Sequence, residues 1–192
     1  MGPDAGGEPR SIYLGPWRID ITWRPGVAKI VPAMGLARAI GATLEAARAP
    51  RPASIGLILA DDDELAGLNS THMGKDGPTD VLSFPMLPPE VFPVRQGLPL
   101  PPLRGRSTTG VAFALPPGRR LHLGDIVVSV ERATEQAEAG RGGQTGDILW
   151  SPADELRLLV THGTLHICGW DHAEPEDETA MRALEKRLLA RA

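Results

Sequence analysis

Hydrophobic and polar positions along the chain predict an ordered series of strands and helices. Alternation or short apolar runs predict four strands, at 17–23, 54–60, 79–86 and 123–130. Helical spacing of apolar residues, often with an acidic first turn, predicts five helices, at 32–49, 61–69, 131–139, 151–169 and 174–190. Residues 1–15 are rich in Gly and Pro, so a loose, flexible N-terminus is expected there.

The segment 151–169 is predicted to be a central helix. Leu158 and Leu165 share one face with two histidines, whereas Val160 and Ile167 lie on the opposite face. A helix that is apolar on both sides is buried. We therefore expect an α+β fold in one domain over 1–192, with a mixed sheet of about four strands packed on this helix.

The segment 87–122 differs from the rest in composition. It holds eight prolines and four glycines, too many prolines for a central strand, so it is interpreted as an insertion. It also carries five arginines against the single Glu90, a local charge of 5 − 1 = +4. Two interpretations stay open: a solvated surface excursion, or a basic flap over a substrate groove. The net charge of −4 therefore does not exclude a polyanionic substrate.

Composition and the N-terminal sequence indicate the compartment. The chain has one cysteine, Cys168, so a disulfide framework within the chain is excluded. The first residues lack the basic and apolar regions of a signal peptide, and no apolar run is long enough to span a membrane. We expect a cytoplasmic protein with no membrane partner, and Cys168 is expected to serve packing.

Three histidines, His162, His166 and His172, predict a metal site. His162 and His166 are one helical turn apart, so their imidazoles point the same way. Gly169 allows the chain to reverse, which brings His172 back to the pair. Three imidazoles with an open fourth position are typical of a catalytic zinc site. The predicted cofactor is one Zn²⁺ per chain, although nickel or another divalent ion could also bind.

The position after the first histidine bears on the chemistry. The spacing H-x-x-x-H-x-x-G-x-x-H is that of metzincin metallopeptidases, which carry a glutamate there as general base. This chain has Gly163 instead. A metzincin-like metallopeptidase stays open as an alternative, but one without its base.

Three blocks resemble the YbeY family of metal-dependent endoribonucleases. They are "HGTLHICGWDH" (162–172), "LNSTHMGKDGPTDVLSFP" (68–85) and "LGDIVVSVERATEQA" (123–137). The resemblance implies a zincin-like fold and a single-strand-specific, zinc-dependent endoribonuclease acting in small-subunit rRNA 3′-end maturation and ribosome quality control. Its partners would be single-stranded RNA, rRNA and the small ribosomal subunit. A ribosome-assembly factor with a structural metal is the non-enzymatic alternative.

The general base for phosphodiester cleavage stays open. A water activated by the metal, a carboxylate or the RNA 2′-hydroxyl could serve. The candidate carboxylates are Asp171, Asp80 and Asp125. Asp80 and Asp125 are expected on strands beside the central helix, where they either accept the second N–H of a zinc-bound histidine or form strand-end hydrogen bonds. Asp171 is interpreted as an orienting group, a catalytic acid or base, or a cap of the last helix.

A cationic group should also meet the scissile phosphate. The family resemblance places an arginine where this chain has Met73. The candidates to replace it are Lys75 and the insertion arginines Arg104, Arg106, Arg119 and Arg120.

Overall fold

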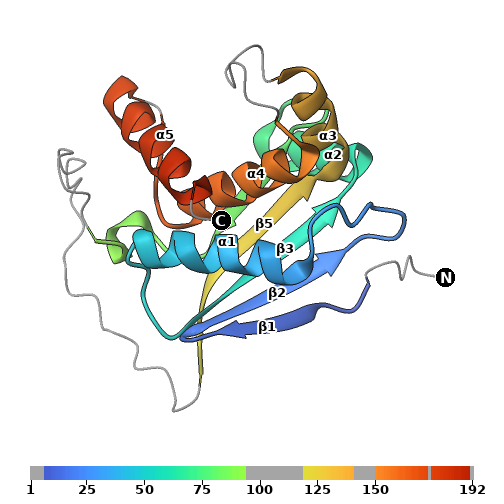
Figure 1. Ribbon diagram of the computed structural model, residues 1–192. Helices are drawn as coiled ribbons and strands as arrows, with labels where there is room; N and C mark the ends of the chain where they lie inside the picture. Colours follow the sequence, from blue (N-terminus) through green and yellow to red (C-terminus); the bar gives the residue numbers. More distant parts are fainter. Residues whose placement is uncertain (1–6, 94–118, 141–149, 173, 191–192) are drawn as a thin grey trace.

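The fold is built on one mixed sheet with the strand order β1-β2-β3-β5-β4 (Figure 1). The computed structural model describes residues 7–93, 119–140, 150–172 and 174–190. The strands are β1 Arg10–Leu14, β2 Trp17–Trp23, β3 Ala53–Ala60, β4 Val81–Pro85 and β5 Leu121–Ser129. The central strands β2, β3 and β5 are parallel, and β1 and β4 pair antiparallel at the two edges.

The expectation of about four strands is wrong by one, because β1 lies inside the segment predicted to be loose. Ile12 is 6% exposed and pairs with Ile19 of β2, while Tyr13 beside it is 61% exposed. Only these few residues alternate, and the surrounding Gly and Pro hid the pattern. The strand becomes stable through its pairing with β2, which local composition does not reveal.

Five helices complete the fold, close to the predicted positions. They are α1 Ala33–Ala46, α2 Asp62–Met73, α3 Val130–Glu138, α4 Pro152–Ile167 and α5 Pro175–Leu189. Helices α1 and α4 pack against the same face of the sheet, with Leu36, Ile55 and Leu156 in one continuous core (Figure 1). Leu65 of α2 packs with Leu82 and Val127 in a separate cluster. Helix α5 packs on α4 through a third cluster.

The central helix is confirmed as α4. Ser151 and Asp154 form a capping box at its start, and Pro152 lies between them in the first turn. Leu156, Val160 and Ile167 are fully buried in the core with the sheet. Leu165 is buried on another side of the helix, against α5. Helix α4 is therefore enclosed by the sheet and by α5, which explains its apolar faces.

The boundaries of the 87–122 segment need correction. A single turn of 3₁₀ helix, η1 Pro89–Val91, leads to Phe92, which is 8% exposed in the main core. At the other end, β5 already begins at Leu121. Both ends of the predicted insertion are thus part of the packed fold. Residues 94–118, which include Arg104 and Arg106, lie outside the described residues.

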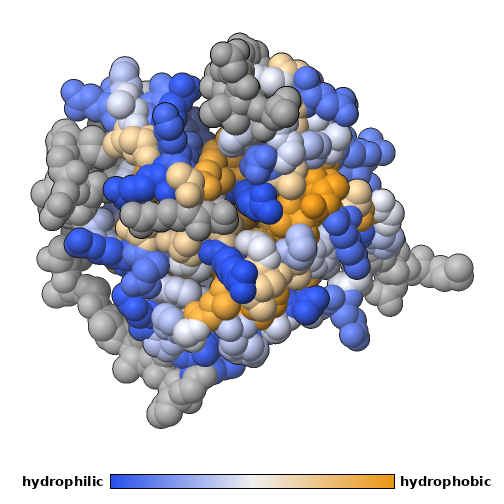
Figure 2. Space-filling view, in the orientation of Figure 1, coloured by the Kyte–Doolittle hydropathy of each residue, from blue (hydrophilic) through white to orange (hydrophobic). Residues whose placement is uncertain are grey.

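Cys168 has the packing role expected of it. It is 3% exposed within the main core, and burial raises the pKa of its thiol to about 12. Within the described ranges, no helix is long and apolar enough to cross a membrane. On the face shown in Figure 2, hydrophobic areas are patches set among hydrophilic side chains.

Candidate metal centre

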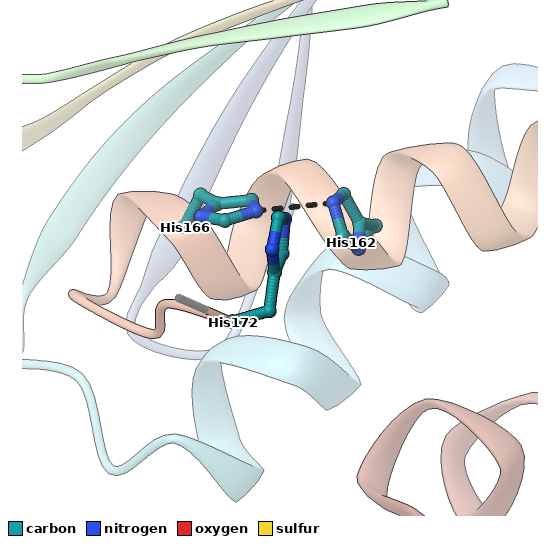
Figure 3. A group of neighbouring side chains, drawn as sticks. All are labelled: His162, His166 and His172. Carbon is teal, nitrogen blue, oxygen red and sulfur yellow. Dashed lines mark hydrogen bonds between the residues drawn. The ribbon is translucent and has the colours of Figure 1, made fainter. Parts of the chain in front are cut away.

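His162 and His166 project from one side of α4 toward a shared point (Figure 3). Their Nε2 atoms are 3.0 Å apart, and their rings meet edge to face. Both side chains are half-buried. These two nitrogens could not lie so close together if both carried protons. The arrangement therefore suits two lone pairs directed at one ion.

The turn after α4 brings the third histidine to the pair. The N–H of Gly169 donates to the carbonyl of His166, and the N–H of Trp170 donates to that of Leu165. These bonds form a Schellman motif, which requires the positive φ of 75° that Gly169 adopts. His172 then lies beside the pair, and the three candidate ligand atoms fall within 4.8 Å of one another (Figure 3). The sequence-predicted triad is thus brought together in the structure.

Glu185 of α5 is a residue of the site that the sequence interpretation missed. Its Oε1 lies 2.7 Å from Nδ1 of His162, and the residue is only 8% exposed. A carboxylate only accepts, so Nδ1 of His162 donates and its Nε2 keeps a free lone pair for a metal. One signal could have found it: Glu185 is an acid within the otherwise apolar stripe of Met181, Leu184 and Leu188.

The surroundings keep His166 neutral. Burial and then the neighbouring His162 and His172 lower the pKa of His166 to about 4, opposed by Asp171 and by a hydrogen bond to the Trp170 backbone. A metal ligand must be the neutral imidazole. His166 therefore stays ready to bind a metal down to mildly acidic pH.

Gly163 lies against the sheet. A Cβ built on it would lie 2.8 Å from Cγ2 of Ile126 and 3.1 Å from Cγ2 of Val81. The Ser83 hydroxyl donates to the Gly163 carbonyl at 3.1 Å. The position that holds the base in a metzincin therefore has no room even for a methyl group, so a glutamate there would separate α4 from the sheet.

Two of the predicted carboxylates lie near the histidines. Asp171 is exposed, and its Oδ1 accepts the backbone N–H of His172 at 2.7 Å. It does not cap α5, whose N-cap residue is Glu174. Asp80 accepts the N–H of Val81 at 2.9 Å and the amide of Gln136 at 3.1 Å. Asp80 thus makes the expected strand-end hydrogen bonds and also borders the site.

Asp125 is not brought to the histidines. Its neighbour Ile126 points toward α4, and side chains alternate along a strand, so Asp125 projects from the opposite face of the sheet. There its Oδ1 lies 3.3 Å from Nε2 of His122. Of the two roles considered for Asp125, its position is incompatible with accepting the N–H of a histidine in the triad.

The predicted cations are spread over the surface. Lys75 is exposed just beyond α2, and Met73 is 47% exposed at the end of that helix. Arg119 is exposed at the start of the segment leading into β5. Arg120 donates to the Pro16 carbonyl and lies over the Tyr13 ring, near the β1–β2 turn. Arg120 is therefore tied to the opposite edge of the sheet from β4.

A cleft of about 300 Å³ adjoins the triad. Its apolar walls include Leu158, Leu159 and Met181. The polar and charged residues that line it are Asp80, His162, His172, Glu178, Arg182 and Glu185. We call this space the histidine cleft. A substrate in it would lie directly beside the three candidate ligands.

The fold and site define an α+β protein with a three-histidine group able to hold a metal ion, set on a central helix. Among known sequences, a family model described as endoribonuclease YbeY matches residues 32–192. The chain belongs to the YbeY endoribonuclease family, as its resemblance in three sequence blocks indicated.

Individual relatives agree with this assignment. Endoribonuclease YbeY of Salinispora tropica is 44% identical over 139 residues, which cover 72% of this chain and 73% of that protein. Endoribonuclease YbeY of Thermobifida fusca is 39% identical, with 81% and 82% covered. That of Roseiflexus sp. is 34% identical, with 89% and 90% covered.

Proposed function

We propose that this protein is a single-domain, zinc-dependent endoribonuclease that cleaves single-stranded RNA. Its proposed role is rRNA processing at the 3′ end of the small-subunit RNA and ribosome quality control, in the cytoplasm. The observation that carries the proposal is the triad of His162, His166 and His172 beside an open cleft, in a chain whose relatives are named endoribonuclease. The proposed fold type is zincin-like.

The donor set fits a zinc ion. His162, His166 and His172 each offer one nitrogen, and these nitrogens lie close enough to share one ion. Glu185 orients His162, as carboxylates commonly do for histidines that bind zinc. When bound, such an ion polarises a phosphoryl oxygen and lowers the pKa of water.

The chain's own groups divide the remaining tasks. Glu185 holds the proton of His162 Nδ1 and so fixes the orientation of that ring. Asp171 is exposed beside His172, so its free carboxylate oxygen can take or give a proton at the mouth of the site. Asp80 is held by Val81 and Gln136, so it serves better to shape the cleft than to move protons. The RNA 2′-hydroxyl stays an alternative base.

The two alternative functions are less well supported. A metzincin-like peptidase lacks a base, and the packing around Gly163 leaves no space for one. A purely structural zinc usually has four protein ligands. In the part of the chain that the structure describes, the group able to hold a metal comprises three residues.

The test is the variant His166→Ala, with His122→Ala as a matched control on the opposite face of the sheet. We expect His166→Ala to lose stoichiometric zinc and to cut single-stranded RNA more than about a hundredfold more slowly. His122→Ala should keep both properties. Zinc is measured by elemental analysis, and cleavage of RNA and of casein is measured with and without a chelator. Full zinc occupancy in His166→Ala, or chelator-sensitive cleavage of casein alone, would contradict the proposal.

A further inference from the structure

The charges of the histidine cleft are unusual for a site that should admit RNA. Three carboxylates line it, from Asp80, Glu178 and Glu185. Among the described residues that line it, Arg182 alone has a permanent positive charge. A bound zinc ion would offset these acids at the scissile phosphate, but a neighbouring backbone phosphate farther from the triad is repelled by them unless a protein cation meets it.

Two of the three carboxylates are already engaged. Glu185 is bound to His162 at 2.7 Å, and Asp80 accepts from Gln136 and the Val81 backbone. Among the described carboxylates of the cleft, Glu178 is the one paired with the cleft arginine, at 2.6 Å between its Oε1 and Nη2 of Arg182. This pair holds the guanidinium of Arg182 in its observed position.

The Arg182–Glu178 pair is easily exchanged. The two residues are one turn apart on α5, and their side chains are 63% and 45% exposed. Exposed pairs of this kind contribute little to stability. The guanidinium has five donors in a planar fork, and a phosphate can accept two of them at once. A phosphate can therefore displace Glu178 without disturbing the fold.

Helix α5 also places Arg182 on the side that borders the histidine cleft. Arg182 and Glu185 are three residues apart, so both lie on the side of α5 that borders the cleft. The helix that orients His162 through Glu185 thereby also places Arg182 in the wall of the same cleft. Arg187, by contrast, lines a separate hollow with Arg48 and Trp170.

We propose that Arg182 contacts a backbone phosphate of the RNA in the histidine cleft, and that Glu178 holds the guanidinium in place until RNA displaces it. This assignment rests on the proposed endoribonuclease function. It predicts opposite changes in RNA affinity when the two partners of this ion pair are substituted. Loss of the arginine weakens RNA binding, whereas neutralising the glutamate strengthens it.

The experiment compares Arg182→Ala, Arg182→Lys and Glu178→Gln with the control Arg187→Ala, all as zinc-loaded full chains. Binding of a fluorescent single-stranded RNA oligonucleotide is followed by anisotropy at several salt concentrations, alongside KM, kcat and zinc content. We expect Arg182→Ala to raise Kd and KM about tenfold, with unchanged zinc. Its salt slope should fall by about 0.7. Arg182→Lys should keep the slope and bind with intermediate affinity.

Glu178→Gln should bind RNA more tightly than the wild type, and Arg187→Ala should match the wild type. If the pair only supports the structure of α5, both Arg182→Ala and Glu178→Gln will weaken binding, which overturns the assignment. Equal behaviour of Arg182→Ala and Arg187→Ala also overturns it, while RNA cleavage by the wild type leaves the proposed function intact. A wild type that neither binds nor cuts RNA refutes the proposed function itself.

Discussion

Gly163 sets the distance between the helix of the metal centre and the sheet. Its missing side chain lets the α4 backbone approach Ile126 and Val81, and Ser83 binds its carbonyl. The sequence alone suggested only that a protease base is absent. The structure adds the physical reason for glycine, which is close packing. The same residue thus serves the fold and leaves this position without the general base of a metzincin.

The Gly163→Ala variant should be less stable. The added methyl group meets Ile126 at 2.8 Å, so α4 or β5 must shift, and we expect the free energy of unfolding to fall by about 1–3 kcal/mol. The matched control is Gly67→Ala on α2, where a Cβ meets nothing within 4 Å. That variant should gain about 0.5–1 kcal/mol from helix propensity. Urea denaturation measures the free energy of unfolding of both variants. Unchanged stability of Gly163→Ala would show that the neighbouring side chains move aside at little energetic cost.

Among the residues of the site, the three histidines were predictable from the sequence, but Glu185, the carboxylate partner of His162, was not. The spacing of His162, His166 and His172 within one helix and one turn is local, so sequence is enough to suggest it. Glu185 reaches His162 only because α5 docks on α4. Asp125 is the converse case, because the sequence made it a candidate for the site but the structure places it on the other face of the sheet. Which face a strand residue occupies depends on register.

The helices were predictable as elements because their caps and apolar stripes are local. Ser151 begins α4 and Gly169 follows its end, as the sequence indicated. The edge strand β1 was missed because it depends on pairing with β2. Helix α2 continues to Met73, beyond its predicted end, and stops at Gly74 with a φ of 63°.

The turn after α4 allows a prediction that separates strain from function. Gly169→Ala places an alanine at a φ of 75° and close to Pro89, and we expect a loss of about 1–2 kcal/mol in the free energy of unfolding. Gly74→Ala has a similar φ of 63° with open space around it, so it should cost a similar amount.

Only Gly169→Ala should also weaken zinc binding, by about tenfold or more, because it displaces His172 from the other two ligands. Thermal unfolding and competition with a chromogenic chelator measure the two effects. Equal zinc affinity in both variants would mean that the turn does not set the position of His172.

For the whole molecule, the open question is the proline- and arginine-rich segment between η1 and β5. Phe92 and Pro89 at its start are fixed by contacts with the core and with Gly169. A deletion should therefore leave them in place. The two interpretations, solvated excursion and basic flap, predict different salt dependence of RNA binding.

Replacing residues 95–117 with a Gly/Ser linker of about ten residues removes Arg95, Arg104 and Arg106. If the segment is a basic flap, the salt slope of RNA binding should fall by up to about 2, with zinc content unchanged. The control is the same linker with three arginines inserted, which should recover part of the slope. An unchanged slope would favour the solvated excursion.

Helix α5 follows the histidines in the chain, and this order has a consequence for protein synthesis. A ribosome that has translated as far as His172 has made all three candidate ligands, but neither Arg182 nor Glu185. His162 then lacks the carboxylate that orients it, and the cleft lacks a wall. The centre is completed only when the last helix folds onto α4. A chain that stops before α5 would therefore lack both the carboxylate partner of His162 and one wall of the histidine cleft.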